Sequence, residues 1–358
     1  DFYKGAYMRT FDYKARYSRL LQPDIVSLVS QIHEQKVKHA LFVEAKADSI
    51  TQLLEMAKIQ STKASNKIEG IYTSDDRLKK IVCDKTVPRT HNEKEIAGYR
   101  DVLNGIHENY AYMPTKTSVI LQMHQDLYKF TGNKGGHFKT LDHIEAQTDP
   151  QGNKAMGFRS VEAGKVPEYM NAICEGFQNT CNDSLYDPLL VISMFILDFL
   201  CIHPFYAGNG RISRLLTLLL LYRSEYTVGM YSSIEKLIEQ TKESYYEALR
   251  NSSLDWYEES NNDLPFVRYM LEVITAAYRD FSSKVQFIIT SGMSKPERVR
   301  EIVRDSFGKM TRTDIMKKCP DISRVTVERA LTDMVKKQEV LKIGGGRYTA
   351  YIWNRGKE

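Results

Sequence analysis

The sequence of 358 residues has no unbroken apolar run of about 18 residues or more, the length that a membrane-spanning helix requires. The longest candidate, Leu189 to Ile202, is interrupted by Ser193 and Asp198. The first residues, DFYKGAYMRTFDYKARYSRL, also lack an uncharged apolar core followed by small residues, which is the pattern of a secretory signal. These absences predict that the chain has no membrane partner and is cytoplasmic.

Cysteine is scarce and has no metal-ligand spacing, which argues against a zinc site. The odd number of five, in a chain this long, favours reduced thiols that pack in the interior. The net charge of +5 is too small to predict nucleic-acid binding by itself, so such a role would need a local basic patch. The sequence has neither a fixed-period repeat nor a low-complexity tract.

The composition, with 42% hydrophobic and 27% charged residues, is that of a globular protein with two or three cores. Residues 1–90 are expected to form a helical region, since the stretch from Ile32 to Ile59 is rich in helix-forming residues. The residues after Ile59 could continue as helix up to Gly70, and a glycine commonly lies just past the end of a helix. Glu69 is therefore expected near a helix C-terminus.

Residues 91–285 are expected to form a second region, mostly helical. Two helical patterns lie between Asn92 and Tyr128, and a turn-rich segment after them predicts a β-hairpin with arms HFKTLDHIEA and KAMGFRSVEA around TDPQGN. The apolar run from Pro188 to Cys201 predicts a buried helix that ends at Pro204. The next helix, rich in leucine, is expected to begin at Gly208 to Gly210.

Residues 295–358 predict a separate small unit, with a boundary near Thr290 to Lys295. The unit reads as three helices and a β-hairpin. Within it, helix, turn, helix and wing are given in order by RTDIMKKCP, ISRVTVERALTDMVKKQ, and the strand-like VLKIGG and RYTAYIW. This order is typical of a winged helix.

The segment HPFYAGNGRISR, residues 203–214, combines groups suited to phosphate chemistry. Gly208, Asn209 and Gly210 can form an anion-binding nest at a helix N-terminus, where glycine lets the backbone approach a phosphate closely. Arg211 and Arg214 can hold further phosphate oxygens, and His203 is a candidate general base. The alternative is that His203 only ends a buried helix and the glycines form a loop, but the complete string favours a functional site.

The same segment resembles the Fic family signature, HxFx[D/E]GNGRxxR, found in enzymes that usually transfer AMP from ATP to a protein hydroxyl. The resemblance implies that His203 activates a Ser, Thr or Tyr hydroxyl, that Phe205 anchors the loop in the core, and that the nest binds the nucleotide with Arg211 and Arg214. It implies a mainly α fold, with a Fic-fold helical core and a β-hairpin flap, plus a small C-terminal winged-helix domain of the α+β type. An N-terminal helical region, a Fic core and a winged-helix tail look like a known bacterial combination.

SNKIEG, from Ser65 to Gly70, looks like the inhibitory pattern of the same family, [S/T]xxxE[G/N]. Glu69 would then pair with Arg214 and occupy the arginine that otherwise holds the γ-phosphate. The alternative is a solvent-exposed glutamate with no such role.

The expected hairpin, residues 137–161, resembles the flap of the family, which would bind a protein target as an added strand. A surface hairpin without a partner is the alternative. KESYYEAL, residues 242–249, also looks like a segment of a Fic core, in which Tyr245 or Tyr246 would pack near the adenine.

Ala207 departs from the family pattern, in which an acidic residue ligates the Mg²⁺ that bridges the nucleotide phosphates. Alanine offers no side-chain oxygen, so the Mg²⁺ expected for the family lacks this ligand here. The nest and both arginines remain to bind ATP as the substrate. Three outcomes stay open: a slow AMP transferase, an enzyme that uses a different donor or the reverse hydrolysis, or a nucleotide-binding pseudoenzyme. An engineered substitution at position 207 is a further alternative.

A function of another class is also compatible with the sequence. The unit 295–358 could bind DNA as part of a transcriptional regulator, with the segment from Ile322 as recognition helix and Lys336, Lys337, Lys342 and Arg347 near phosphates. Winged helices also dock proteins or dimerise, so a homodimer and self-modification stay open.

Overall fold

The structure is a computed structural model that describes residues 8–45, 47–142, 147–148, 154–155, 160–291, 293–304, 306, 308–346 and 349–354. The chain divides into two compact units, Asp1–Phe281 and Ser282–Glu358. The division falls within α12, Leu264–Ser291.

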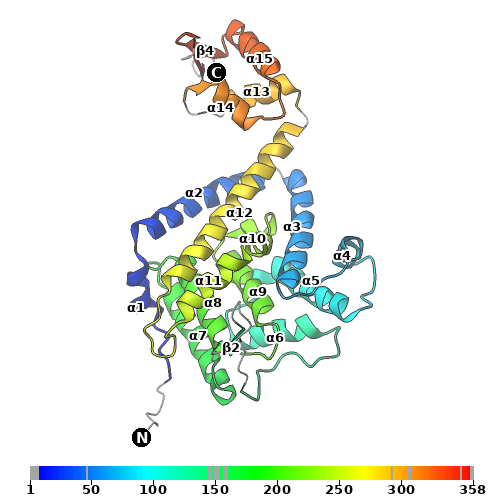
Figure 1. The fold of residues 1–358 in the computed structure, drawn as a ribbon, viewed down its shortest axis with the longest axis vertical. Helices are drawn as coiled ribbons and strands as arrows, with labels where there is room; N and C mark the ends of the chain where they lie inside the picture. The colour runs from blue at the N-terminus through cyan, green and yellow to red at the C-terminus, as the bar shows by residue number, and fades with distance from the viewer. Residues whose placement is uncertain are drawn as a thin grey trace. The chain divides into compact units, whose positions relative to one another are not determined.

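The first unit is built almost entirely of helices (Figure 1). The α-helices of this unit that precede α12 are α1 Tyr13–Tyr17, α2 Pro23–Ala45, α3 Ala47–Ile68, α4 Asp75–Val82, α5 His91–Asn109, α6 Thr117–Tyr128, α7 Val166–Cys181, α8 Pro188–Ile202, α9 Asn209–Arg223, α10 Ile234–Gln240 and α11 Lys242–Ser253. Short 3-10 turns lie at Ser18–Leu20, Tyr110–Tyr112, Ala163–Lys165 and Thr227–Met230.

α8 and α9 form the centre of this unit and pack against each other (Figure 1). α8 begins at Pro188, where the missing N–H of proline costs nothing, and the side chain of Asp187 accepts a hydrogen bond from the N–H of Leu189. Every residue of α8 from Leu189 to Ile202 is buried. The sequence prediction of a buried helix that ends before Pro204 is confirmed.

Helices α3, α5 and α6 carry the residues that approach the start of α9. The predicted position of Glu69 is confirmed, since α3 ends at Ile68 and Gly70 follows with a left-handed φ of 75°. The stretch from Ile32 to Ile59 belongs to two helices, α2 and α3. α4 was not predicted as a separate helix. Its N-cap, Ser74, accepts a hydrogen bond from the N–H of Arg77.

The predicted hairpin is present as a short pair of antiparallel strands, β1 Gln147–Thr148 and β2 Lys154–Ala155. Gln147 lies opposite Ala155 and Thr148 opposite Lys154. The arms were predicted to start at His137, yet residues 137–142 are not strand. Most of the TDPQGN turn lies outside the described residues.

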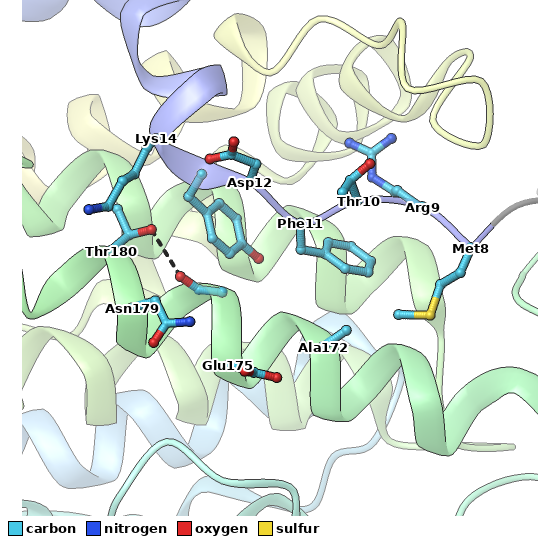
Figure 2. Close-up of a pocket in the computed structure, with 12 residues that line it drawn as sticks. Met8, Arg9, Thr10, Phe11, Asp12, Lys14, Ala172, Glu175, Asn179 and Thr180 are labelled. Atoms are coloured by element: carbon cyan, nitrogen blue, oxygen red, sulfur yellow. Dashed lines mark hydrogen bonds between the residues drawn. The ribbon is translucent and has the colours of Figure 1, made fainter.

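The segment from Met8 to Lys14 runs along α7 (Figure 2). Gly176 permits this approach, because a Cβ there would lie 2.4 Å from the backbone oxygen of Phe11. A surface pocket of about 390 Å³ lies between the segment and α7.

The second unit has its own core and a three-stranded antiparallel sheet of order β3-β5-β4. Its elements are α13 Lys295–Arg304, β3 Met310–Thr311, α14 Arg312–Lys318, α15 Arg324–Lys336, β4 Val340–Ile343 and β5 Ala350–Trp353. The three helices and the last two strands follow the order read from the sequence, whereas β3 was not expected. The assignment as a winged helix and the binding of DNA stay predictions.

Among the described residues, no helix is both long and apolar enough to cross a membrane. All five cysteines lie in described segments and carry free thiols. Cys174, Cys201 and Cys319 are buried as predicted, and burial raises the pKa of Cys174 to about 11. Cys83 is exposed, so the prediction of interior packing was wrong for that residue.

Candidate functional site

His203 lies directly after α8, in a left-handed backbone conformation with φ 51° and ψ 63°. Its N–H donates a hydrogen bond to the carbonyl of Phe199 at 3.1 Å, which closes the last turn of the helix. A non-glycine residue in this region of φ and ψ is strained, and such residues often occur at functional sites. The conformation turns the chain away from α8 into the loop that leads to α9.

Phe205 and Asn209 fold that loop onto itself. The N–H of Phe205 donates to Asn209 Oδ1 at 3.0 Å, and Asn209 Nδ2 donates to the carbonyl of Phe205 at 2.7 Å. Phe205 is 1% exposed, as the resemblance implies for an anchor in the core. Asn209 is also buried, so its side-chain amide shapes the loop from inside.

His124 of α6 packs against the loop and was not predicted as a residue of the site. Its ring stacks on Phe205, with centroids 3.8 Å apart and planes 3° from parallel. His124 Nδ1 accepts from the N–H of Gly136 at 3.0 Å, so the proton must lie on Nε2, which donates to the carbonyl of Ala207 at 3.2 Å. Burial lowers the pKa of His124 to about 4, and the ring is neutral near pH 7.

Two glycines make the start of α9 accessible to an anion. Gly208 is the N-cap of α9, with a φ of 84°, and no side chain caps the helix. A Cβ at position 210 would lie 2.3 Å from Glu69 Oε1, so glycine is needed for the carboxylate to come this close. Since a helix N-terminus favours negative charge, Glu69 lies where an anion is stabilised.

Arg214 connects this carboxylate to the end of α3. Its Nη2 donates to Glu69 Oε1 at 2.7 Å and to the carbonyl of Ser65 at 2.9 Å, and its Nε donates to Ser65 Oγ at 2.8 Å. The ion pair expected from the sequence is thus present. Ser65 and Glu69 of the SNKIEG pattern therefore contact the same guanidinium.

The environment of Arg214 leaves part of its hydrogen-bonding capacity unused. The side chain is 3% exposed, whereas that of Glu69 is 31% exposed. Burial lowers the pKa of Arg214, but the charge of Glu69 raises it, and the net direction is upward. Arg214 Nη1 is buried without a hydrogen-bond partner in the part of the chain that the structure describes. A buried cationic donor of this kind is suited to bind a further anionic oxygen.

Arg211 has a carboxylate of its own. Its Nη2 lies 2.5 Å from Glu95 Oε2 of α5 and donates to the hydroxyl of Tyr128 at 2.8 Å. The pair is buried, because the side chain of Arg211 is 3% exposed and that of Glu95 is 10% exposed. Removing one member of a buried pair costs about 3–5 kcal/mol, so this contact fixes α5 and α6 to α9. Arg211 is therefore less free than Arg214 to change partners.

Ala207 lies at the position of the expected metal ligand, and its carbonyl already accepts from His124. Within the described residues, no group of three or more His, Cys, Asp or Glu side chains could hold a metal ion. Glu69 is engaged by Arg214, and Asn209 Oδ1 by Phe205. The side chains present do not fit a protein-held Mg²⁺.

Several residues around the motif were not singled out from sequence, among them His124, Tyr128, Glu95 and Tyr206. Tyr206 lies inside the motif, and its neighbours in the sequence could have drawn attention to it. The pocket of Figure 2 shares no lining residue with the motif, so its location does not bear on this chemistry. Tyr245 is buried and Tyr246 is 38% exposed, and a role for either beside an adenine stays a prediction.

The comparisons with known proteins place this site in a Fic/DOC family domain. Residues 114–221, which include α6 to α8 and the motif, match the family model described as Fic/DOC family. A search of curated proteins gave no match.

Solved structures of Fic proteins share the fold. A Fic family protein from Desulfovibrio desulfuricans G20 has 20% identity and a TM-score of 0.62, over 94% of this chain and 97% of its own. A Fic domain containing signaling protein from Bacteroides thetaiotaomicron has 17% identity and a TM-score of 0.60, over 72% of this chain and 98% of its own. Fic-1 (residues 134–508) from C. elegans has 19% identity and a TM-score of 0.56, over 76% of each chain.

Proposed function

We propose that this protein transfers AMP from ATP to a hydroxyl side chain of a target protein or of itself, and that Glu69 inhibits the reaction by pairing with Arg214. The Fic/DOC family is known for transfer of AMP or other nucleotide groups to proteins, which supports the class of reaction. The residues of the motif and their surroundings support the particular reaction.

The observation that carries the proposal is the position of the Glu69 carboxylate. It lies between the N-terminus of α9 and the guanidinium of Arg214, at a place that favours a negative group. Glu69 is partly exposed and comes from outside α9, so a phosphate oxygen of ATP can replace it without disturbing the loop. The buried Nη1 of Arg214 then provides a second donor for that phosphate.

The chemical step assigned to His203 is a proton transfer. The target hydroxyl oxygen attacks the α-phosphorus of ATP and forms a P–O bond, while the bond from that phosphorus to the pyrophosphate oxygen breaks. His203 accepts the hydroxyl proton, and pyrophosphate leaves with its negative charge held by the nest and Arg214. General-base assistance of this kind contributes roughly 10²- to 10⁴-fold in rate.

Ala207 sets the expected rate. A bound Mg²⁺ in related chemistry neutralises developing phosphate charge, which is worth several kcal/mol in the transition state. Because no side chain at position 207 can hold the ion, turnover is expected to be slow, whereas nucleotide binding depends on the nest and Arg214. The target segment is proposed to bind along the flap, residues 137–161, by strand addition.

The test is the intact mass of the purified protein after incubation with ATP and Mg²⁺. The starting protein is compared with Glu69→Ala, with Glu69→Ala/Ala207→Asp, and with the latter carrying His203→Ala. The expected result is a mass gain of one AMP group that is slow without Ala207→Asp, faster with it, and lost with His203→Ala. Absence of the adduct in every form would contradict transfer of AMP to this protein itself.

A further inference from the structure

The two stems of the flap are attached to the backbone on both sides of His203. We define the stems as residues 137–142 and 160–163, which precede and follow the β1–β2 hairpin. The N–H of Lys139 donates to the carbonyl of Pro204 at 3.0 Å, and the N–H of Val161 donates to the carbonyl of Ile202 at 3.3 Å. Each immediate neighbour of His203 therefore accepts a hydrogen bond from one stem.

These hydrogen bonds bear on the strain at His203. A left-handed conformation at a non-glycine residue costs roughly 1–3 kcal/mol and persists only when the surrounding structure imposes it. The hydrogen bond from His203 to Phe199 fixes one end of the residue. The stems fix the carbonyl groups on either side, so they take part in holding the backbone of His203.

The stems are also attached to each other. Lys139 is 2% exposed, and its Nζ donates to Ser160 Oγ at 2.6 Å. The N–H of Ala163 donates to Asp142 Oδ1 at 2.6 Å. A lysine is rarely buried, because desolvation of the ammonium is costly unless it is compensated. The hydrogen bond of this buried ammonium to Ser160 holds the two stems together beside the loop.

Tyr206 adds a third attachment from within the motif. Its hydroxyl accepts from the N–H of Thr140 at 3.0 Å and from the N–H of Leu141 at 2.7 Å, and lies 3.1 Å from Thr140 Oγ1. The hydrogen bond with the Thr140 hydroxyl has the largest effect on the pKa of Tyr206 and lowers it from its ordinary value. The hydrogen bonds from the two N–H groups lower it further. Tyr206 is 46% exposed, so packing does not account for its position, whereas the hydrogen bonds do.

We propose that Tyr206 and Lys139 are positioning residues that couple the flap stems to the backbone of His203. This inference rests on the proposed function, in which the flap binds the target and His203 receives its proton. The coupling keeps the segment that presents the hydroxyl in register with the base that activates it. A positional error of about 1 Å can reduce a rate by roughly 100-fold, so such attachments matter for the chemical step.

The experiment compares Tyr206→Phe and Lys139→Met with two surface controls. Tyr206→Phe removes only the hydroxyl that accepts from the stem, and Lys139→Met keeps the apolar length without the ammonium. Tyr112→Phe is the matched control for the first, since Tyr112 is 86% exposed, and Lys116→Met for the second, since Lys116 is exposed. All four are made in the full chain carrying Glu69→Ala/Ala207→Asp.

The first measurement is hydrogen–deuterium exchange of peptides that contain residues 138–142 and 202–206. Loss of a hydrogen bond worth about 1 kcal/mol predicts exchange faster by roughly fivefold in both segments of Tyr206→Phe and Lys139→Met, and no change in the controls. The second measurement is the rate of AMP transfer and the Kd for ATP. The rate is expected to fall by about tenfold or more, with the Kd unchanged.

The outcomes separate this inference from the proposed function. Unchanged exchange in both variants overturns the coupling, whatever the transfer rate. Faster exchange with an unchanged rate overturns the positioning role. If no form of the protein transfers AMP, the proposed function fails, and exchange still decides whether the stems hold the backbone at His203.

Discussion

His124 is the residue whose charge depends most clearly on its place under the motif. Its pKa is lowered by burial from an ordinary value of about 6.5 to about 4. A histidine with a lowered pKa in the folded state binds a proton more readily when unfolded. It therefore stabilises the fold fully above about pH 6.5, and this contribution is lost as the pH falls towards 4.

We predict that lowering the pH from 8 to 5 reduces the free energy of unfolding by about 2 kcal/mol through His124. Denaturant unfolding of His124→Gln, which keeps an amide donor for the carbonyl of Ala207, should show a pH dependence smaller by this amount. His39 and His107 are also buried, with pKa values lowered to about 4 and about 3, so part of the dependence remains in the variant. An identical pH dependence in both proteins would contradict the neutral buried state of His124.

The residues of the motif could be recognised from the sequence because they are contiguous, from His203 to Arg214. The ion pair of Glu69 with Arg214 was also predicted, because both patterns come from the same family resemblance. Glu95 and His124 could not be predicted, since each lies in a helix far from the motif in sequence and only packing brings it there. A single glutamate or histidine in a helical pattern carries no signal for such a contact.

Among the helices, the start of α9 depends on glycine at position 208. A side chain there would be strained at a φ of 84°, and its Cβ would lie 2.9 Å from the hydroxyl of Tyr128. We predict that Gly208→Ala lowers the free energy of unfolding by about 2 kcal/mol, since the left-handed conformation alone costs about 1–2 kcal/mol. Thermal or denaturant unfolding measures this change.

Gly105→Ala is the matched control for that prediction. Gly105 lies within α5, and a Cβ there has no neighbour within 4 Å. Because alanine favours a helix by about 1 kcal/mol over glycine, this substitution should stabilise the protein. Equal effects of the two substitutions would contradict the role assigned to Gly208.

Elements were predictable where their pattern is local. The apolar density of α8, stopped by Pro204, and the Gly-Asn-Gly start of α9 define both helices around the motif. The predicted position of the hairpin is right, but its strands are shorter than predicted. Residues 137–142 form hydrogen bonds with the motif loop and with Tyr206 instead of with a partner strand. Alternation in the sequence cannot distinguish these two kinds of backbone partner.

At the scale of the whole molecule, the chain combines a helical unit that contains a Fic/DOC domain with a second unit that has its own core. The second unit was expected from the sequence as residues 295–358, whereas the observed division falls earlier, after Phe281. Arg312 and Arg324 pair with Glu328, and β4 exposes Leu341 and Ile343, so the surface is mixed in charge and partly apolar.

The central claim is that Arg214 is shared between Glu69 and the nucleotide. It is tested most directly by calorimetric titration of ATP into the starting protein, Glu69→Ala, Arg214→Met and the double variant. Glu239→Ala is the control, because it removes a carboxylate that pairs with Lys67 of α3 and that itself lies outside residues 65–70 and 203–214.

The account predicts that Glu69→Ala tightens ATP binding by about tenfold, within the range typical of coupling between two sites. Glu239→Ala should leave the Kd unchanged, and Arg214→Met should weaken binding. In the Arg214→Met background no guanidinium is present at position 214. Glu69→Ala should therefore not tighten ATP binding by releasing that group. Equal ATP affinity with and without Glu69, in the presence of Arg214, would contradict the account.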